Sequence, residues 1–268
     1  MDVREAIFKR YSNRNFREAA MEEVALEAFL NGLKQIPLLY KNGEFTIRFL
    51  SFGEMNEYFP DDAPNMIYAP YYLIFYGESR PDVYQNVGYL GQLAILWLTV
   101  NGYSSCWQAV EQLRQTDDKP EISRKEEDTF VGDPLPIALT FGIEDRRQGP
   151  GKPARKKPLR NLMVPGSPDP DSEWRMLLEA GRQAPSEYNG QPWRFWIANE
   201  GVHLFRKGSF FFRSERHQNM SYVSLGCLLA NIMTMAELRQ IGLELHREGR
   251  SFESVKGLEY ILSFYRTN

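Results

Sequence analysis

The sequence has few of the residues that build metal centres and disulfide frameworks. Its 268 residues include two cysteines and three histidines, and neither an HExxH pattern nor paired Cys-x-x-Cys occurs. A metal site is therefore not expected. Cys106 and Cys227 lie far apart in apolar, helical surroundings, which favours two buried free thiols in a reducing compartment over a disulfide.

Long apolar runs and an excess of positive charge are also missing. The longest apolar run without proline, Leu93–Val100, is far shorter than the roughly 18–20 residues of a membrane helix. Residues 1–10 alternate charges and do not resemble a secretory signal. With 32 Lys and Arg against 35 Asp and Glu, the net charge of −3 gives no general positive field for nucleic acid. We therefore expect a cytoplasmic protein that binds neither membrane nor nucleic acid.

Three common nucleotide-binding and hydrolase motifs are absent as well. No Gly-x-Gly-x-x-Gly follows a predicted strand, and no Gly-x-Ser-x-Gly occurs. Gly151–Lys152 is followed by Pro153, where a P-loop needs Ser or Thr. Rossmann, P-loop and α/β-hydrolase chemistry are not expected.

What the sequence does contain is one pattern of helices and strands that occurs twice. Apolar periodicity predicts helices at 2–10, 21–34, 82–101, 172–183 and 221–240, and strands at 45–49, 71–76, 137–141, 195–198 and 202–205. The stretch from Tyr84 to Gly102 aligns with that from Tyr222 to Gly242, with a two-residue difference in length. We infer an internal duplication of roughly 130 residues per copy.

A basic, proline-rich segment separates the two copies. Between residues 146 and 170, six prolines interleave with seven Lys and Arg. Contact with nucleic acid is one interpretation, but the proline density and the net negative charge favour a linker. We expect a first half at 1–145, a linker at 146–170 and a second half at 171–268, which together form one α+β unit. Each half is expected to hold a central sheet and a long core helix.

Two short segments concentrate side chains that can bind a ligand. Residues 10–16 (RYSNRNF) place two guanidinium groups and a hydroxyl within five residues, which suits phosphate oxygens. Residues 184–193 (APSEYNGQPW) bring Ser, Asn and Gln beside aromatic rings and can hydrogen-bond the edge of a planar heterocycle. A solvated basic turn and ordinary turn chemistry are the alternatives for these two segments.

Together these segments resemble the signatures of the nitroreductase family. Residues 10–16 are similar to its Arg-x-Ser-x-Arg-x-Phe signature, and residues 184–193 to its second signature. Residues 102–107 resemble the turn after its central helix, and residues 155–159 resemble its basic segment near the C-terminus. The resemblance covers nearly the whole chain and implies a nitroreductase-like α+β fold in two tandem, similar halves.

Each copy lacks one of the two main signatures. The first copy has residues 36–42 (IPLLYKN) where Pro-Ser-x-x-Asn is expected, and the second has no Arg-x-Ser-x-Arg before Trp174. In the family, the flavin is held by the first signature of one subunit and the second signature of its partner. The resemblance therefore implies a fused pseudo-dimer with one complete flavin site, one dead site and a monomeric state, the layout of a two-lobed subgroup of nitroreductases.

The resemblance also implies FMN as cofactor, NADH or NADPH as co-substrate, and a role for each matching residue. The FMN phosphate and ribityl tail would be bound by Arg10 and Ser12, with Arg155 or Lys156 neutralising the phosphate, and Arg14 would face the flavin N1–O2 edge. The isoalloxazine would contact Pro185, Ser186 and Asn189, and the backbone near Trp107 and Gln108 would approach N5.

The implied reaction is a two-step transfer in which a small acceptor such as a nitroaromatic, a quinone or a free flavin takes the electrons. Because the flavin carries the chemistry, no catalytic side chain is expected. Three alternatives remain: another flavin reaction such as dehalogenation or flavin breakdown, a non-catalytic flavin-binding or sensing protein, and a scaffold without cofactor.

Overall fold

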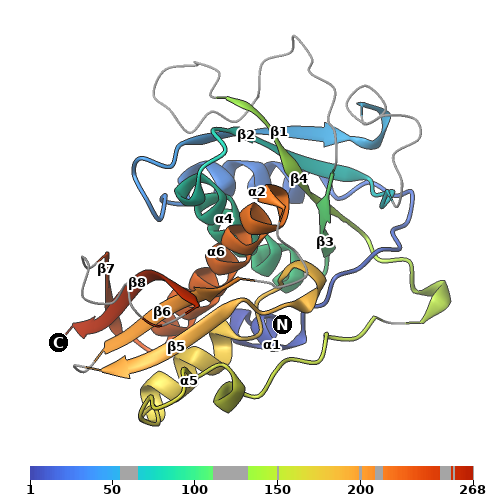
Figure 1. The fold of residues 1–268 in the computed structure, drawn as a ribbon. Coiled ribbons are helices and arrows are strands. Elements are labelled where there is room, and N and C mark those ends of the chain that lie inside the picture. The colour runs from blue at the N-terminus through green and yellow to red at the C-terminus, as the bar shows by residue number, and fades with distance from the viewer. Residues whose placement is uncertain are drawn as a thin grey trace. The chain divides into compact units, whose positions relative to one another are not determined.

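The chain forms two compact units, Met1–Pro153 and Ala154–Asn268 (Figure 1). This computed structural model describes residues 1–54, 66–110, 132–149, 151–198, 201–208, 214–247, 255 and 257–267. Residues 154–170 of the expected linker belong to the second unit.

The first unit is built around a four-stranded antiparallel sheet with strand order β1-β2-β4-β3. Its elements are α1 (Val3–Lys9), α2 (Glu23–Gln35), β1 (Phe45–Ser51), β2 (Tyr71–Gly77), α4 (Pro81–Val100), β3 (Ser104–Ala109), β4 (Asp133–Gly142) and the short η1 (Arg146–Gln148). The predicted helices and strands of this half are confirmed, with bounds that differ by a few residues. Strand β3 was not predicted, because SSCWQA lacks a clear apolar alternation. Most of the polar loop expected before residue 133 lies outside the described residues.

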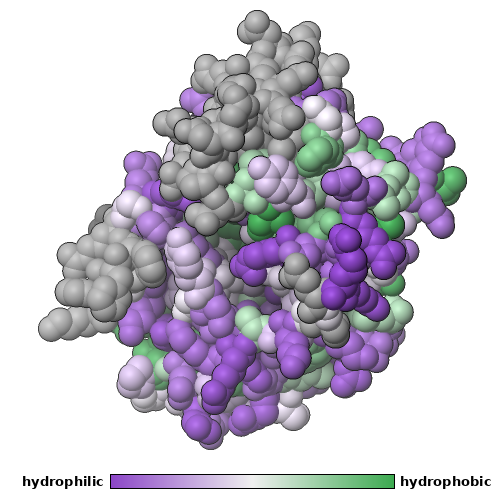
Figure 2. All heavy atoms as spheres, turned by 90° about the vertical axis from the view of Figure 1, so that its right-hand side faces the viewer, coloured by the Kyte–Doolittle hydropathy of each residue, from purple (hydrophilic) through white to green (hydrophobic). Residues whose placement is uncertain are grey.

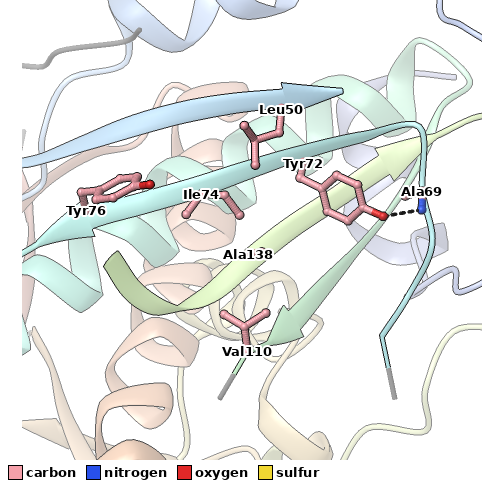
Figure 3. Packing of buried hydrophobic residues seen from close by; sticks show 7 residues of the cluster. All are labelled: Leu50, Ala69, Tyr72, Ile74, Tyr76, Val110 and Ala138. Atoms are coloured by element: carbon pink, nitrogen blue, oxygen red, sulfur yellow. Dashed lines mark hydrogen bonds between the residues drawn. The ribbon is translucent and has the colours of Figure 1, made fainter. Parts of the chain in front are cut away.

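Both faces of the first sheet are buried. Every residue of β2 is buried, as the run Tyr71–Tyr76 predicts for a central strand. Figure 3 shows the cluster on one face, where Tyr72 and Ile74 lie near Leu50 and Ala138, and where the Tyr72 hydroxyl accepts the Ala69 N–H at 2.7 Å. Aromatic rings pack on the opposite face, with Phe29 of α2 and Phe141 of β4 5.0 Å apart between centroids.

The second unit repeats this topology. Its sheet has the order β5-β6-β8-β7 and is also antiparallel. Its elements are η2 (Leu159–Asn161), α5 (Ser172–Gly181), η3 (Glu187–Asn189), β5 (Trp193–Ala198), β6 (Gly201–Lys207), α6 (Glu215–Leu238), β7 (Gly242–His246) and β8 (Leu258–Thr267). The matching strand orders confirm two similar halves.

Two sequence-based expectations need correction. Helix α6 begins at Glu215, before the expected residue 221, because the Ser214 hydroxyl caps it by accepting the His217 N–H at 3.4 Å. Cys106 lies in strand β3 and not in a helical context, whereas Cys227 lies in α6. Both thiols are buried and free, as expected.

Helix α6 is long and apolar, but it is a core element of its unit. Helix α6 has the length and composition of a membrane span, but 72% of its apolar window is buried inside the protein, as in the core helix of a globular unit. No group of three or more His, Cys, Asp or Glu that could hold a metal lies within the described ranges. The described residues on the face drawn in Figure 2 are mostly hydrophilic, with smaller hydrophobic areas between them.

Helix α4 packs against β3 where Gly91 lies next to the Trp107 ring. A Cβ atom at Gly91 would lie 2.3 Å from two ring carbons of Trp107. We expect Gly91→Ala to lower the free energy of unfolding by about 1–3 kcal/mol through overpacking. A Cβ atom at Gly32 of α2 would have no atom within 4 Å. Gly32→Ala should therefore raise the free energy of unfolding by about 0.5–1 kcal/mol. Urea denaturation of both variants checks the contrast, and equal effects would contradict it.

Candidate functional site

Residues 10–17 run in an extended conformation along the first sheet. Ser12 forms a parallel bridge with Ser105 at the outer edge of β3, and the Asn13 N–H donates to the Ser105 carbonyl at 3.0 Å. Farther along, the Arg17 N–H donates to the Ile143 carbonyl at 2.9 Å. These bonds hold the predicted anion-binding segment against the sheet.

The extended backbone directs alternate side chains of this segment to one side. Arg10, Ser12 and Arg14 are two residues apart, and all three act on the thiol of Cys106. Burial raises the pKa of that thiol, while the Arg14 charge, the Ser12 hydroxyl and the Arg10 charge oppose the rise. Ser12 thus hydrogen-bonds this buried thiol, and the charges of Arg10 and Arg14 both act on it.

The opposite side of the segment is anchored by Glu144. Its buried carboxylate accepts hydrogen bonds from the Tyr11 hydroxyl, from Arg146 Nε at 2.9 Å and from the Gly151 N–H at 3.4 Å. Burial raises the pKa of Glu144, but the hydrogen bonds from Tyr11 and Arg146 outweigh burial and hold this pKa below its ordinary value. A Cβ atom at Gly151 would lie 2.1 Å from the Tyr11 ring, so only glycine fits there. Sequence reasoning missed Glu144, because no local pattern links it to Tyr11.

Trp107 and Gln108 of β3 contribute side chains to opposite faces of the sheet. The Trp107 ring packs against α4 at Gly91, and Gln108 Oε1 accepts the Ile67 N–H at 3.0 Å. In an antiparallel ladder, the backbone groups of Trp107 point to the same edge as those of Ser105. What Trp107 offers a ligand at this edge is therefore its backbone.

In the second unit, the basic segment 155–157 is bound to the loop of the second signature. Lys156 Nζ donates to the Ala184 carbonyl at 2.6 Å and to Asn189 Oδ1 at 3.2 Å. Asn189 Nδ2 donates to the Arg155 carbonyl at 2.8 Å. The Lys157 N–H donates to Gln191 Oε1 at 2.8 Å. The Lys156 ammonium therefore holds this loop, while the Arg155 side chain is exposed.

The loop has an unusual backbone that these bonds stabilise. Tyr188, Asn189 and Gln191 have φ values of 46°, 54° and 52°, in the left-handed region that side chains disfavour. The buried Gln191 closes the loop, since its N–H donates to Ser186 Oγ at 3.0 Å and its Nε2 to the Asn189 carbonyl at 3.0 Å. Gln191 belongs to the matched signature but was not among the predicted site residues.

The predicted site residues therefore form two groups, one in each unit. The first unit holds Arg10, Ser12 and Arg14 on one side of residues 10–17, with Trp107 and Gln108 in β3. The second unit joins Arg155, Lys156 and Asn189 through direct hydrogen bonds, with Pro185 and Ser186 in the same loop.

The corresponding loop of the first copy is held differently. Asn86 of α4 accepts the Tyr40 N–H at 2.9 Å and donates to the carbonyls of Tyr40 and Gly43, each at 2.7 Å. In the alignment of the two long helices, Asn86 corresponds to Ser224, whose hydroxyl accepts the Glu187 N–H at 3.4 Å. The same helix position thus binds the loop in both copies, but only the second copy adds a basic segment.

Glu187 is the one strongly perturbed carboxyl of the second loop. Its Oε1 lies 3.8 Å from His217 Nε2, and the neighbouring Tyr188 ring stacks on the His217 ring at 6.2 Å between centroids. Burial raises the pKa of Glu187 to about 7, while Arg216 opposes the rise. The carboxyl thus titrates near neutral pH.

A largely apolar cavity of about 700 Å³ lies elsewhere in the first unit. It is lined by residues 16–20, 51–53 and 68–71, which include the signature residue Phe16. None of the ten predicted site residues lines it among the described parts of the chain.

Comparison with known proteins establishes the family. The sequence profile of the family described as "Putative TM nitroreductase" matches residues 2–236. The chain therefore belongs to this nitroreductase family, whose members are oxidoreductases. No curated protein matches the sequence.

A solved structure that spans nearly the whole chain agrees with the fold. The putative nitroreductase of Thermotoga maritima superposes with a TM-score of 0.64 at 18% identity, over 98% of this chain and 93% of that one. A mutant of NfnB, an FMN- and NADPH-dependent nitroreductase from "sphigopyxis sp. strain HMH", gives a TM-score of 0.45 at 15% identity, over 61% of this chain and 98% of that one. An FMN-dependent nitroreductase from Clostridium difficile gives a TM-score of 0.41 at 14% identity, over 55% of this chain and 90% of that one.

The raised pKa of Glu187 makes stability depend on pH. Between the ordinary value of 4.5 and about 7, the folded protein keeps a proton that the unfolded chain has released, so the free energy of unfolding falls as pH rises through this window. We expect Glu187→Gln to remove this fall and to be about 1–2 kcal/mol more stable than the parent at pH 8. Urea denaturation from pH 4.5 to 8 measures it.

Glu237→Gln is the matched control, because this carboxyl is exposed near the end of α6. It should leave the pH slope unchanged. If the free energy of unfolding of Glu187→Gln falls with pH as steeply as that of the parent, the fall does not come from Glu187.

Proposed function

We propose that the protein is an FMN-dependent NAD(P)H oxidoreductase with a single flavin site formed by residues of both halves. The observation that carries this proposal is the alternation of Arg10, Ser12 and Arg14 along a segment that is hydrogen-bonded to β3, where all three act on the thiol of Cys106. Membership of the nitroreductase family supports the class of reaction.

The donors of the first unit suit a phosphate monoester. Two guanidinium groups offer forked N–H donors to a dianion, and the Ser12 hydroxyl adds a neutral donor. The carboxylate of Glu144 is bound by Tyr11 and ion-paired with Arg146. We propose that Arg10 and Ser12 hold the FMN phosphate and ribityl tail, with Arg155 as the basic residue from the second half.

The second unit offers donors and acceptors for the edge of a planar ring. Ser186 Oγ accepts the Gln191 N–H, so its own hydroxyl hydrogen can donate to a ligand. The Asn189 amide is held at both ends by Lys156 and Arg155, which fixes its orientation. We propose that Pro185, Ser186 and Asn189 contact the isoalloxazine, and that the backbone near Trp107 and Gln108 approaches N5.

When bound, FMN would take a hydride from NADH or NADPH and pass the electrons to a small acceptor such as a nitroaromatic, a quinone or a free flavin. The protein supplies binding, orientation and charge. Arg14, next to Ser12 on the same side of the segment, would favour negative charge at the N1–O2 edge of the ring. No side chain of the chain need act as acid or base for this hydride step.

The absorption spectrum tests the proposal directly. Purified protein loaded with FMN and desalted should stay yellow with about one flavin per chain, and anaerobic NADH or NADPH should bleach it. Two flavins per chain would contradict the single site. Colour without bleaching would indicate a flavin-binding or sensing protein, and a colourless protein would contradict the flavin assignment.

The phosphate-binding role of Arg10 is tested by comparing FMN with riboflavin. Arg10→Gln should weaken FMN binding by about 10- to 100-fold and riboflavin binding much less, because the charged donor meets only the phosphate. Arg4→Gln, on the exposed face of α1, is the matched control and should bind both like the parent. Fluorescence titration measures the affinities, and an equal loss for both ligands would contradict this role.

We also propose that the chain is a monomer, since each half retains the signature that the other lacks. Light scattering with loaded FMN should give the mass of one 31.2 kDa chain at micromolar concentration. A stable dimer would contradict this proposal.

A further inference from the structure

Three cationic side chains of the second unit lie close together on one face of its sheet. Arg194 is in β5 opposite Phe205 of β6, which makes Lys207 its diagonal neighbour on the same face. The residues next to them point the other way, since Arg206 stacks over the Tyr222 ring of α6 at 4.6 Å. Lys157 approaches from the basic segment, and the charges of Arg194 and Lys207 both act on it.

The side chains of Lys157 and Arg194 donate to backbone carbonyls. Lys157 Nζ donates to the Gly190 carbonyl at 2.5 Å, and Arg194 Nη1 donates to the carbonyls of Gln191 at 3.1 Å and Trp193 at 2.5 Å. Within the described residues, no carboxylate forms an ion pair with any of the three cations.

Other arginines of the same unit differ in this respect. Arg206 pairs with Glu259, Arg182 pairs with Glu179, and Arg266 pairs with two carboxylates at 2.5 and 2.7 Å. Lys157, Arg194 and Lys207 instead repel one another. Burial, followed by the charges of Arg194 and Lys207, lowers the pKa of Lys157, and burial lowers that of Arg194. An anion bound among them would relieve this repulsion.

We infer that Lys157, Arg194 and Lys207 form a binding site for the phosphate group of a nucleotide. A phosphate monoester carries close to two negative charges and accepts both the guanidinium fork and ammonium donors. The choice of phosphate rests on the cation cluster alone. The choice of a nucleotide rests on the proposed function, because Gly190 and Gln191, whose carbonyls bind these cations, lie in the loop that holds Ser186 and Asn189.

Two nucleotides of the proposed reaction could supply this phosphate, and paired ligands separate them. FMN is compared with riboflavin by affinity, and NADPH with NADH by KM, in Lys207→Gln and Arg194→Gln. Lys207 is exposed, so its replacement should leave the fold intact, and Arg194→Lys keeps the charge. Arg175→Gln, on the exposed side of α5, is the matched control for charge.

In one of the two pairs, we expect Lys207→Gln to weaken binding of the phosphorylated ligand by about fivefold and Arg194→Gln to weaken it by about tenfold. The other ligand of that pair should bind as it does to the parent. Arg194→Lys should recover part of the loss. A loss of NADPH over NADH would make the 2′-phosphate the occupant. A loss of FMN over riboflavin would make the flavin phosphate the occupant, and would then contradict its placement on Arg10 and Ser12. If both pairs behave in these variants as in Arg175→Gln, the inference is wrong.

Inorganic phosphate separates failure of this inference from failure of the proposed function. Calorimetric titration at constant ionic strength should show weaker phosphate binding in Lys207→Gln than in Arg175→Gln, even if the protein binds no flavin. In that case the phosphate site stands and the flavin proposal falls. Equal phosphate binding in the two variants overturns the site.

Discussion

The backbone pairing of residues 10–17 with the first sheet is the interaction on which the candidate site depends. Side chains of an extended segment alternate strictly, so the register of this pairing decides what faces the ligand. With Ser12 opposite Ser105, Arg10, Ser12 and Arg14 share the side of Cys106, and Tyr11 meets Glu144. A slip by one residue would bring the tyrosine and two asparagines to the ligand side.

Two copies of one topology carry different restraints on the same loop. In each, the loop before the first strand of the copy is bound by one position of the long helix, Asn86 in α4 and Ser224 in α6. The amide of Asn86 makes three bonds to its loop, whereas the hydroxyl of Ser224 accepts one from Glu187. In the second copy, Lys156 and Gln191 supply the remaining restraint. Similar folds have therefore diverged at the positions that restrain this loop.

Much of the fold could be predicted from the sequence, because its signals are local. The long helices follow from apolar periodicity, and the buried strand β2 follows from the run Tyr71–Tyr76. Strand β3 could not be predicted, since its residues lack alternation and its pairing partners lie 28 to 38 positions away in β4.

The site could be predicted only as far as its signatures. Residues 10–16 and 184–193 are contiguous and carry their own pattern. Glu144 is 133 positions from Tyr11. Lys207 lies diagonal to Arg194 across the sheet and Lys157 comes from the basic segment, so nothing local in the sequence indicates either grouping. The sequence shows the charge of Lys156 but not its hydrogen-bond partners. Its ammonium donates to two oxygens of the protein, the Ala184 carbonyl and Asn189 Oδ1.

The left-handed backbone of the loop after α5 has a consequence for where this chain can be divided. Tyr188, Asn189 and Gln191 keep conformations that cost about 1–3 kcal/mol each only while bonds from residues 155–157 over-determine them. A fragment that starts at the second repeat, near residue 171, would retain all four strands of its sheet and lose the shape of its loop. The boundary expected for the second repeat and the boundary of the compact unit are thus different, and the residues between them belong structurally to the second unit.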